Sequence, residues 1–166
     1  PVFVVADGMG GHAAGEVAAR LAVETLEELA GTQLLGIDAV RGPVEEANRR
    51  IWEAGKEPGQ RGMGTTVTGC AALTDGSWAI FNVGDSRVLH IHDGEIRQLT
   101  VDHSEVQDMV TLGILAPDEA AVHPMRHIVT RSLGARPGVQ VDIERLEVVP
   151  GDRLLVCSDG LTDEVA

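Results

Sequence analysis

Two Asp-Gly dipeptides, each lying between two strand-like runs, constrain the fold of this 166-residue chain more than any other feature of its sequence. They are Asp75-Gly76 and Asp93-Gly94. Asp-Gly between alternating runs is one of the strongest local signals of a β-hairpin. The runs that they join are residues 65–73, 78–83, 87–91 and 95–100. We therefore predict that these four strands pair antiparallel as one meander.

The chain before this region has the pattern of amphipathic helices. From Ala14 onward one helical face is apolar and the other is charged, and the apolar residues are Val17, Leu21, Leu26 and Leu29. A second helix is predicted after Gly42-Pro43, where apolar residues recur at spacings of three and four. Later elements are predicted at residues 104–112 (helix), 139–148 and 153–157 (strands). Helices followed by hairpins indicate an α+β domain in which helices cover antiparallel sheet.

The composition limits the classes of partner. Lys and Arg number 13 against 26 Asp and Glu, a formal net charge of −13, which argues against binding of nucleic acid or anionic membranes. The two cysteines, Cys70 and Cys157, each lie in an apolar strand-like run. This placement favours buried thiols in a reducing compartment, so we expect a cytoplasmic protein or a cytosolic part of a larger one. The sequence has no run long enough to span a bilayer.

Three further aspartates, Asp7, Asp85 and Asp159, stand at predicted strand ends next to glycine. A carboxylate there can point into a cleft, and the glycine allows backbone and ligand to approach closely. An ordinary turn explains any one of them alone, as it explains the hairpin aspartates. Asp7 differs because it follows an apolar strand and precedes the glycine-rich residues 8–12. Carboxylate oxygens without a cysteine cluster indicate Mg²⁺ or Mn²⁺ and not Zn²⁺.

Four short motifs follow one another along the chain. They are Val5–His12 (VADGMGGH), Gly62–Thr66 (GMGTT), Asn82–Arg87 (NVGDSR) and Ser158–Asp163 (SDGLTD). Together they resemble the metal-dependent Ser/Thr protein phosphatases of type 2C in their bacterial form. Each motif alone is a weak signal, and the threonines of the second are explained equally well by strand propensity. All four in the family's order, over nearly the whole chain, make a strong one.

The resemblance implies a four-layer α-β-β-α sandwich of two mainly antiparallel sheets flanked by helices, with a metal site in the cleft at one edge. There Asp7 is expected to bridge two Mn²⁺ or Mg²⁺ ions, the Gly8 carbonyl to bind one of them, and Asp159 to bind the other. Asp85 is expected to share a third, weaker ion with Asp159, and Asp163 to be a nearby acid outside the direct ligands. The metals would activate a water for attack on phosphoserine or phosphothreonine in proteins.

The histidines leave alternatives open. His12 is either the acid that protonates the leaving oxygen, a role the family gives to a histidine near this loop, or a surface loop histidine. His90 and His92 lie on one strand face and are interpreted as structural, with a metal pair as the alternative. The others carry no signal that assigns a role: His103, His123 and His127.

Residues 104–126 are predicted to include a flap over one surface. The part at 113–126 has weak periodicity and contains two prolines. Arg126 and Arg131 lie around this flap and are interpreted as surface arginines, with contact to a phosphopeptide as the alternative.

Two other classes of protein compete with this interpretation. A cysteine-dependent phosphatase is excluded, because positions 76 and 163, six residues after the two cysteines, are not arginine. A non-catalytic member acting as a binding or regulatory module is the alternative. The family has a further acidic ligand before the first motif and another beyond the last. We therefore expect residues 1–166 to be one catalytic domain truncated at both ends. Its expected partners are phosphorylated proteins, including Ser/Thr kinases and their substrates, and we expect a monomer.

Overall fold

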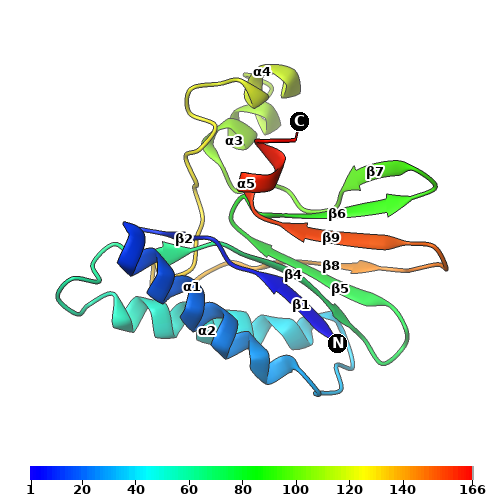
Figure 1. The fold of residues 1–166 in the computed structure, drawn as a ribbon, viewed down its shortest axis with the longest axis horizontal. Helices are drawn as coiled ribbons and strands as arrows, with labels where there is room; N and C mark the ends of the chain where they lie inside the picture. The colour runs from blue at the N-terminus through cyan, green and yellow to red at the C-terminus, as the bar shows by residue number, and fades with distance from the viewer. Residues whose placement is uncertain (166) are drawn as a thin grey trace.

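The computed structural model describes residues 1–165, apart from the side chain of His12. Four strands form an antiparallel sheet in the order β1-β4-β5-β8. Their bounds are Val2–Val5 (β1), Val67–Ala72 (β4), Trp78–Val83 (β5) and Asp142–Leu146 (β8). A three-stranded sheet has the order β7-β6-β9, with bounds Arg87–His92 (β6), Glu95–Gln98 (β7) and Arg153–Cys157 (β9). Figure 1 shows β6, β7 and β9 on the side of the four-stranded sheet that faces away from α1 and α2.

Both predicted hairpins are confirmed, but the single meander is wrong. Ala72 pairs with Trp78 across the first turn, and His92 pairs with Glu95 across the second. β5 and β6, however, belong to different sheets. The connection between them turns at Gly84, whose φ is 113°. Alternating runs specify which neighbours form hairpins, but a short connection can either turn a strand back or pass it to a facing sheet.

The central strands are buried on both faces, and alternate residues face two different apolar layers. Residues that face the helices include Val67, Ala71, Phe81 and Val83. Cys70 and Ile80 face the second sheet, where they pack with Val88. Burial on both faces explains why the sequence of these strands is almost continuously apolar. Cys70 and Cys157 are buried free thiols, as predicted.

Helices α1 (His12–Leu26) and α2 (Arg41–Ala54) lie against the outer face of the four-stranded sheet (Figure 1). Two short 3-10 helices connect them, η1 (Glu27–Leu29) and η2 (Ile37–Val40). The predicted apolar face is confirmed at Leu26 in α1 and at Leu29 in η1, while Val17 and Leu21 are only half-buried. Small residues are buried along the rest of that face: Ala14, Ala18 and Ala22. Small side chains allow the helix backbone to approach the sheet closely.

Residues 104–130, here called the excursion, leave the sheets and return. They contain α3 (Glu105–Thr111) and α4 (Pro117–Ala121). The predicted cap of α3 is confirmed, since Gln107 N–H donates to Ser104 Oγ at 3.3 Å. Backbone hydrogen bonds of 2.9 Å close the base of the excursion, from Glu105 N–H to the Ile128 carbonyl and from Thr130 N–H to the His103 carbonyl. That its residues 104–126 move as a flap stays a prediction.

The predicted α+β sandwich of two mainly antiparallel sheets with flanking helices is confirmed. A short helix α5 (Asp159–Thr162) follows β9 and lies with α3 and α4 at one end of the sandwich (Figure 1). None of the described helices combines the length and the apolar character needed to cross a membrane.

Candidate active site

Asp7 follows β1 directly and opens the glycine-rich loop that leads to α1. Thr66 holds its backbone on both sides. Asp7 N–H donates to Thr66 Oγ1 at 3.0 Å, and Thr66 N–H donates to the Asp7 carbonyl at 2.9 Å. Immediately beyond, β2 (Gly8–Met9) pairs antiparallel with β3 (Gly64–Thr65). The first and second sequence motifs therefore form one hydrogen-bonded unit that fixes the position of Asp7.

Gly8 approaches helix α1 so closely that a side chain cannot be accommodated. A Cβ at Gly8 would lie 2.0 Å from the Gly15 carbonyl oxygen, and a Cβ at Gly15 would lie 2.8 Å from the Gly8 carbonyl carbon. Two further loop residues have positive φ, Gly10 at 108° and Gly11 at 88°, which glycine adopts with little strain. The glycine run therefore brings the start of α1 into backbone contact with the residue after Asp7.

Asp85 follows β5 and is buried, with 9% of its surface exposed. A Cβ at the preceding Gly84 would lie 2.6 Å from Thr66 Cγ2. On the other side, Ser86 Oγ lies 2.7 Å from Thr66 Oγ1 and shares a hydrogen bond with it. Strand propensity alone therefore does not explain Thr66, because its hydroxyl also links the backbone of Asp7 to the Asp85 loop.

Asp159 follows β9 and begins α5, which also carries Asp163 at its end. One ligand atom each from Asp159, Asp163 and His127 lie within 4.8 Å of one another. His127 Nδ1 is 3.5 Å from Asp163 Oδ2. No role for His127 can be predicted from sequence, because it lies in the excursion, far along the chain from Asp159. Only the folded chain brings these three side chains together.

The carboxylates repel one another. Burial raises the pKa of Asp7, and the charge of Asp159 raises it further, against a smaller opposing effect of a hydrogen bond with Ser158. Burial, followed by the charge of Asp159, raises the pKa of Asp85 to about 6. The nearby Arg87 guanidinium is paired with a different carboxylate, that of Asp102. This set of hard oxygen donors with surplus negative charge fits Mg²⁺ or Mn²⁺.

A hollow of about 480 Å³ lies between the Asp85 loop, α5 and the excursion. Its acidic lining residues are Asp85, Asp102, Asp159 and Asp163. Apolar residues of α3 and α4 also line it, together with Arg126. Asp7 is not part of this lining and lies beside Asp159. A hollow lined by apolar residues together with a few charged side chains is typical of a site that binds a small ligand or a small group on a larger one.

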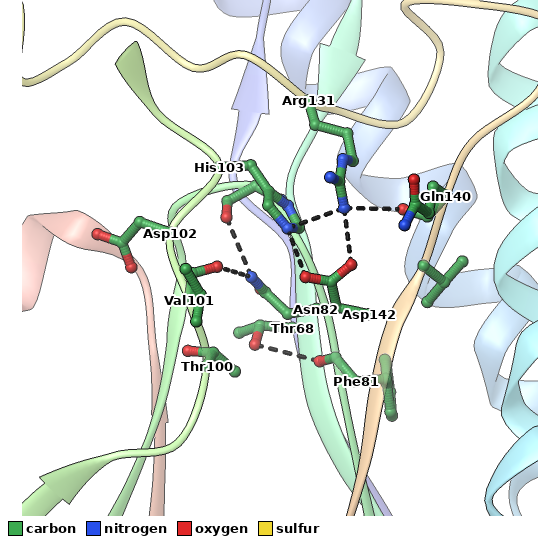
Figure 2. Close-up of polar contacts among 12 residues, drawn as sticks. Thr68, Phe81, Asn82, Thr100, Val101, Asp102, His103, Arg131, Gln140 and Asp142 are labelled. Carbon is green, nitrogen blue, oxygen red and sulfur yellow. Dashed lines mark hydrogen bonds and ion pairs between the residues drawn. The ribbon is translucent and has the colours of Figure 1, made fainter. Parts of the chain in front are cut away.

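A polar layer supports the Asp85 loop from behind. Arg87 holds Asp102 through two nitrogens, with Nη2 at 2.6 Å from Oδ2 and Nε at 3.1 Å. Asn82 Nδ2 donates to the carbonyls of Gly84 and Val101, both at 3.1 Å. Figure 2 shows Asn82 beside His103, which meets Asp142 and Arg131 on its other side. No role for His103 can be predicted from sequence, since its partners come from segments distant in the chain.

The remaining predicted residues have varied outcomes. His90 and His92 stack on each other and both face the Asp152 carboxylate, at 3.0 and 2.6 Å. They line a second hollow, separate from the one that Asp85 and Asp159 line, which is in keeping with a structural role. Arg131 binds Asp142 at 2.8 Å. His12 is the first residue of α1, and its side chain lies outside the part of the chain that the structure describes, so its role as an acid stays a prediction.

We expect Asp85→Asn to stabilise the protein when divalent cations are removed. The pKa of Asp85 is raised from 3.8 to about 6, so its ionised form destabilises the folded state. This penalty grows as pH rises from 3.8 to about 6 and is constant above that. Two pH units correspond to at most about 3 kcal/mol, and screening leaves about 1 to 2 kcal/mol.

Thermal melts in EDTA test this expectation. The Tm of Asp85→Asn should exceed that of the wild type by about 3 to 6 °C at about pH 7.5 and by much less at about pH 4. A Tm difference that is the same at both pH values would show that the ionisation of Asp85 is not its cause.

Known proteins resemble this chain over its whole length. The sequence matches the family model described as protein phosphatase 2C over residues 1–166. Protein phosphatase PhpP of Streptococcus pneumoniae (serotype 2, strain D39) is 38% identical over 170 residues, which cover 99% of this chain and 69% of that protein. The crystal structure of the Mycobacterium tuberculosis serine/threonine phosphatase PstP/Ppp has a TM-score of 0.87 at 37% identity, covering 98% of this chain and 69% of that one. A catalytic domain of PstP in complex with two manganese ions has a TM-score of 0.81 at 36% identity, covering 98% and 68%.

Proposed function

The chain belongs to the protein phosphatase 2C family, and on this premise we propose that it removes phosphate from phosphoserine and phosphothreonine in proteins. The observation that carries the proposal is the convergence of Asp7, Asp85 and Asp159 from three different motifs. The charge of Asp159 raises the pKa of both Asp7 and Asp85, and that of Asp7 also raises the pKa of Asp85, as expected of carboxylates arranged for cations. The relatives are named as serine/threonine phosphatases, and one holds two manganese ions.

We propose that Asp7 and Asp159 hold two central Mn²⁺ or Mg²⁺ ions, with the Gly8 carbonyl as a further ligand. Asp85 shares a third, weaker ion with Asp159. Asp163 lies close enough to Asp159 to assist at the same ion, which extends its expected role. When bound, these cations supply a water of lowered pKa and the positive charge that an acidic chain needs to hold a phosphate.

The protein's own groups position the reacting parts. Thr66 fixes the backbone of Asp7 and, through Ser86, the loop of Asp85. Arg126 lines the same hollow as the acids, where it can attract a phosphorylated segment. The leaving serine or threonine oxygen needs a proton, and His12 is the proposed donor.

We also propose that the substrates are phosphorylated cytoplasmic proteins, including Ser/Thr kinases and their targets. The buried free thiols Cys70 and Cys157 support a reducing compartment. The net charge of −13 supports protein and not nucleic acid as the ligand.

Phosphate release by the full-length protein tests the proposed function. With Mn²⁺ we expect turnover of phosphoserine and phosphothreonine peptides, and none after EDTA treatment. Asp93→Asn is the matched control, because this hairpin aspartate is also followed by glycine but its side chain is 90% exposed. It should leave turnover unchanged. A folded protein that binds the peptides but releases no phosphate would instead be the non-catalytic module.

A further inference from the structure

His103 is a buried residue that holds both backbone groups of the residue before Asp85. Gly84 N–H donates to His103 Nδ1 at 2.9 Å, and His103 N–H donates to the Gly84 carbonyl at 2.9 Å. Asn82 Nδ2 makes a second bond to the same carbonyl. The peptide groups on both sides of Gly84 are therefore fixed. Gly84 has φ of 113°, and a glycine backbone has few steric restraints of its own. The hydrogen bonds with His103 and Asn82 therefore set the direction in which Asp85 leaves the strand.

The far side of the His103 ring faces Asp142 (Figure 2). Because Nδ1 accepts from Gly84, the ring proton of His103 is assigned to Nε2, which donates to Asp142 Oδ2 at 2.9 Å. Arg131 Nη1 lies 2.9 Å from the same ring nitrogen. Arg131 Nη1 donates to Asp142 Oδ1 at 2.8 Å. Burial alone would raise the pKa of Asp142, but the hydrogen bonds from His103 and Arg131 outweigh it and lower this pKa. Asp142 thus remains an ionised acceptor that orients the ring.

His103 also lies at the base of the excursion. Its carbonyl accepts from Thr130 N–H at 2.9 Å, and the next residue, Ser104, bridges to Val129. Arg131, directly after this returning segment, is bound to the same carboxylate as the ring of His103. One residue therefore connects three parts of the molecule: the Asp85 loop, strand β8 and the base of the excursion.

We propose that His103 is a positioning residue for Asp85, holding the Gly84 peptide so that the carboxylate is presented to the weaker of the proposed cations. This inference rests on the proposed function. Residues that orient metal ligands commonly change metal affinity or activity by 10- to 100-fold when they are replaced. The effect of His103 is expected on the weaker ion and on turnover, and not on peptide binding.

Two conservative variants separate the two ends of the ring. His103→Asn keeps an oxygen acceptor near the position of Nδ1 and loses the reach to Asp142. His103→Gln keeps an amide donor near the position of Nε2 and loses the acceptor for Gly84. Each variant removes one side-chain hydrogen bond, so a merely structural role predicts similar losses of Tm and activity in both.

The variants are compared in the full-length protein by kcat and KM over a range of Mn²⁺ concentrations, by Mn²⁺ calorimetry, and by amide hydrogen exchange at Gly84. For His103→Gln we expect kcat to fall and the Mn²⁺ requirement to rise, each about 10-fold or more, with KM for the peptide and the tight ions unchanged. Gly84 exchange should accelerate. His103→Asn should stay within about 3-fold of the wild type in each quantity.

Equal impairment of the two variants, in proportion to their Tm, would overturn the proposal. So would wild-type Mn²⁺ dependence in His103→Gln. If the wild type itself releases no phosphate, the proposed function fails, and the calorimetry and Gly84 exchange still decide whether His103 positions the Asp85 loop.

Discussion

Asp7→Asn is expected to abolish phosphatase activity while leaving the fold intact. Asparagine has nearly the same shape, and the two hydrogen bonds with Thr66 use only the backbone of Asp7, so they survive. What is lost is the negative charge next to Asp159, on which both central cations would depend. We expect kcat to fall by about 10³-fold or more, since stabilisation by bound metal is worth several kcal/mol and each 1.4 kcal/mol is a factor of ten.

The experiment combines kcat with a calorimetric titration of Mn²⁺, using Asp93→Asn as the control. Asp93 has a φ of 47°, which asparagine tolerates, so this variant should match the wild type in both measurements. Because Asp7→Asn removes charge repulsion, its Tm in EDTA should be equal to or above that of the wild type. If Asp7→Asn bound Mn²⁺ with unchanged affinity, Asp7 would not be the central ligand.

Gly8→Ala is expected to have the largest effect on the fold. Its Cβ would lie 2.0 Å from the Gly15 carbonyl oxygen, and both are backbone positions that cannot turn aside. Either α1 moves off β2 or the loop after Asp7 is displaced. Overpacking of this kind costs about 1 to 3 kcal/mol or more. We expect a loss of about 3 kcal/mol or more in the free energy of unfolding, and loss of Mn²⁺ binding even where the variant folds.

Two variants give this prediction its controls. Gly36→Ala adds a methyl group where nothing lies within 4 Å, so urea unfolding should be nearly unchanged. Gly15→Ala tests the same contact from the helix side. Alanine gains about 1 kcal/mol of helix propensity, but its Cβ would lie 2.8 Å from the Gly8 carbonyl carbon, so we expect net destabilisation. Wild-type stability in both Gly8→Ala and Gly15→Ala would show that α1 does not depend on this approach.

The sequence was most informative where local chemistry determines the outcome. Asp75-Gly76 and Asp93-Gly94 specified two hairpins, and Ser104 specified the start of α3. The glycine run after Asp7 distinguished this candidate site residue from the aspartates of the hairpin turns. The close approach of Gly8 to α1 needs more glycine than a turn does.

It was least informative where the outcome depends on which distant segments meet. The placement of β5 and β6 in different sheets follows from packing on both faces of the four-stranded sheet, which local periodicity does not encode. Nothing in the sequence relates His103 to Asp142, and the local pattern indicates only a surface or phosphopeptide-binding arginine at Arg131. Their roles emerge only from mutual contact. Thr66 lies within the second motif, but only the folded chain shows that its hydroxyl bonds to both Asp7 and Ser86.

Carboxylates from three motifs are proposed to hold the catalytic cations. Anomalous X-ray diffraction from crystals of the full-length protein soaked in Mn²⁺ shows whether they do. Data collected above and below the manganese absorption edge locate Mn²⁺ without assumptions about its ligands. We expect two strong peaks within coordinating distance of the Asp7 and Asp159 carboxylates and a weaker one between Asp85 and Asp159, the weaker one being lost in Asp85→Asn. Strong peaks located elsewhere, with none beside Asp7, would contradict this proposal.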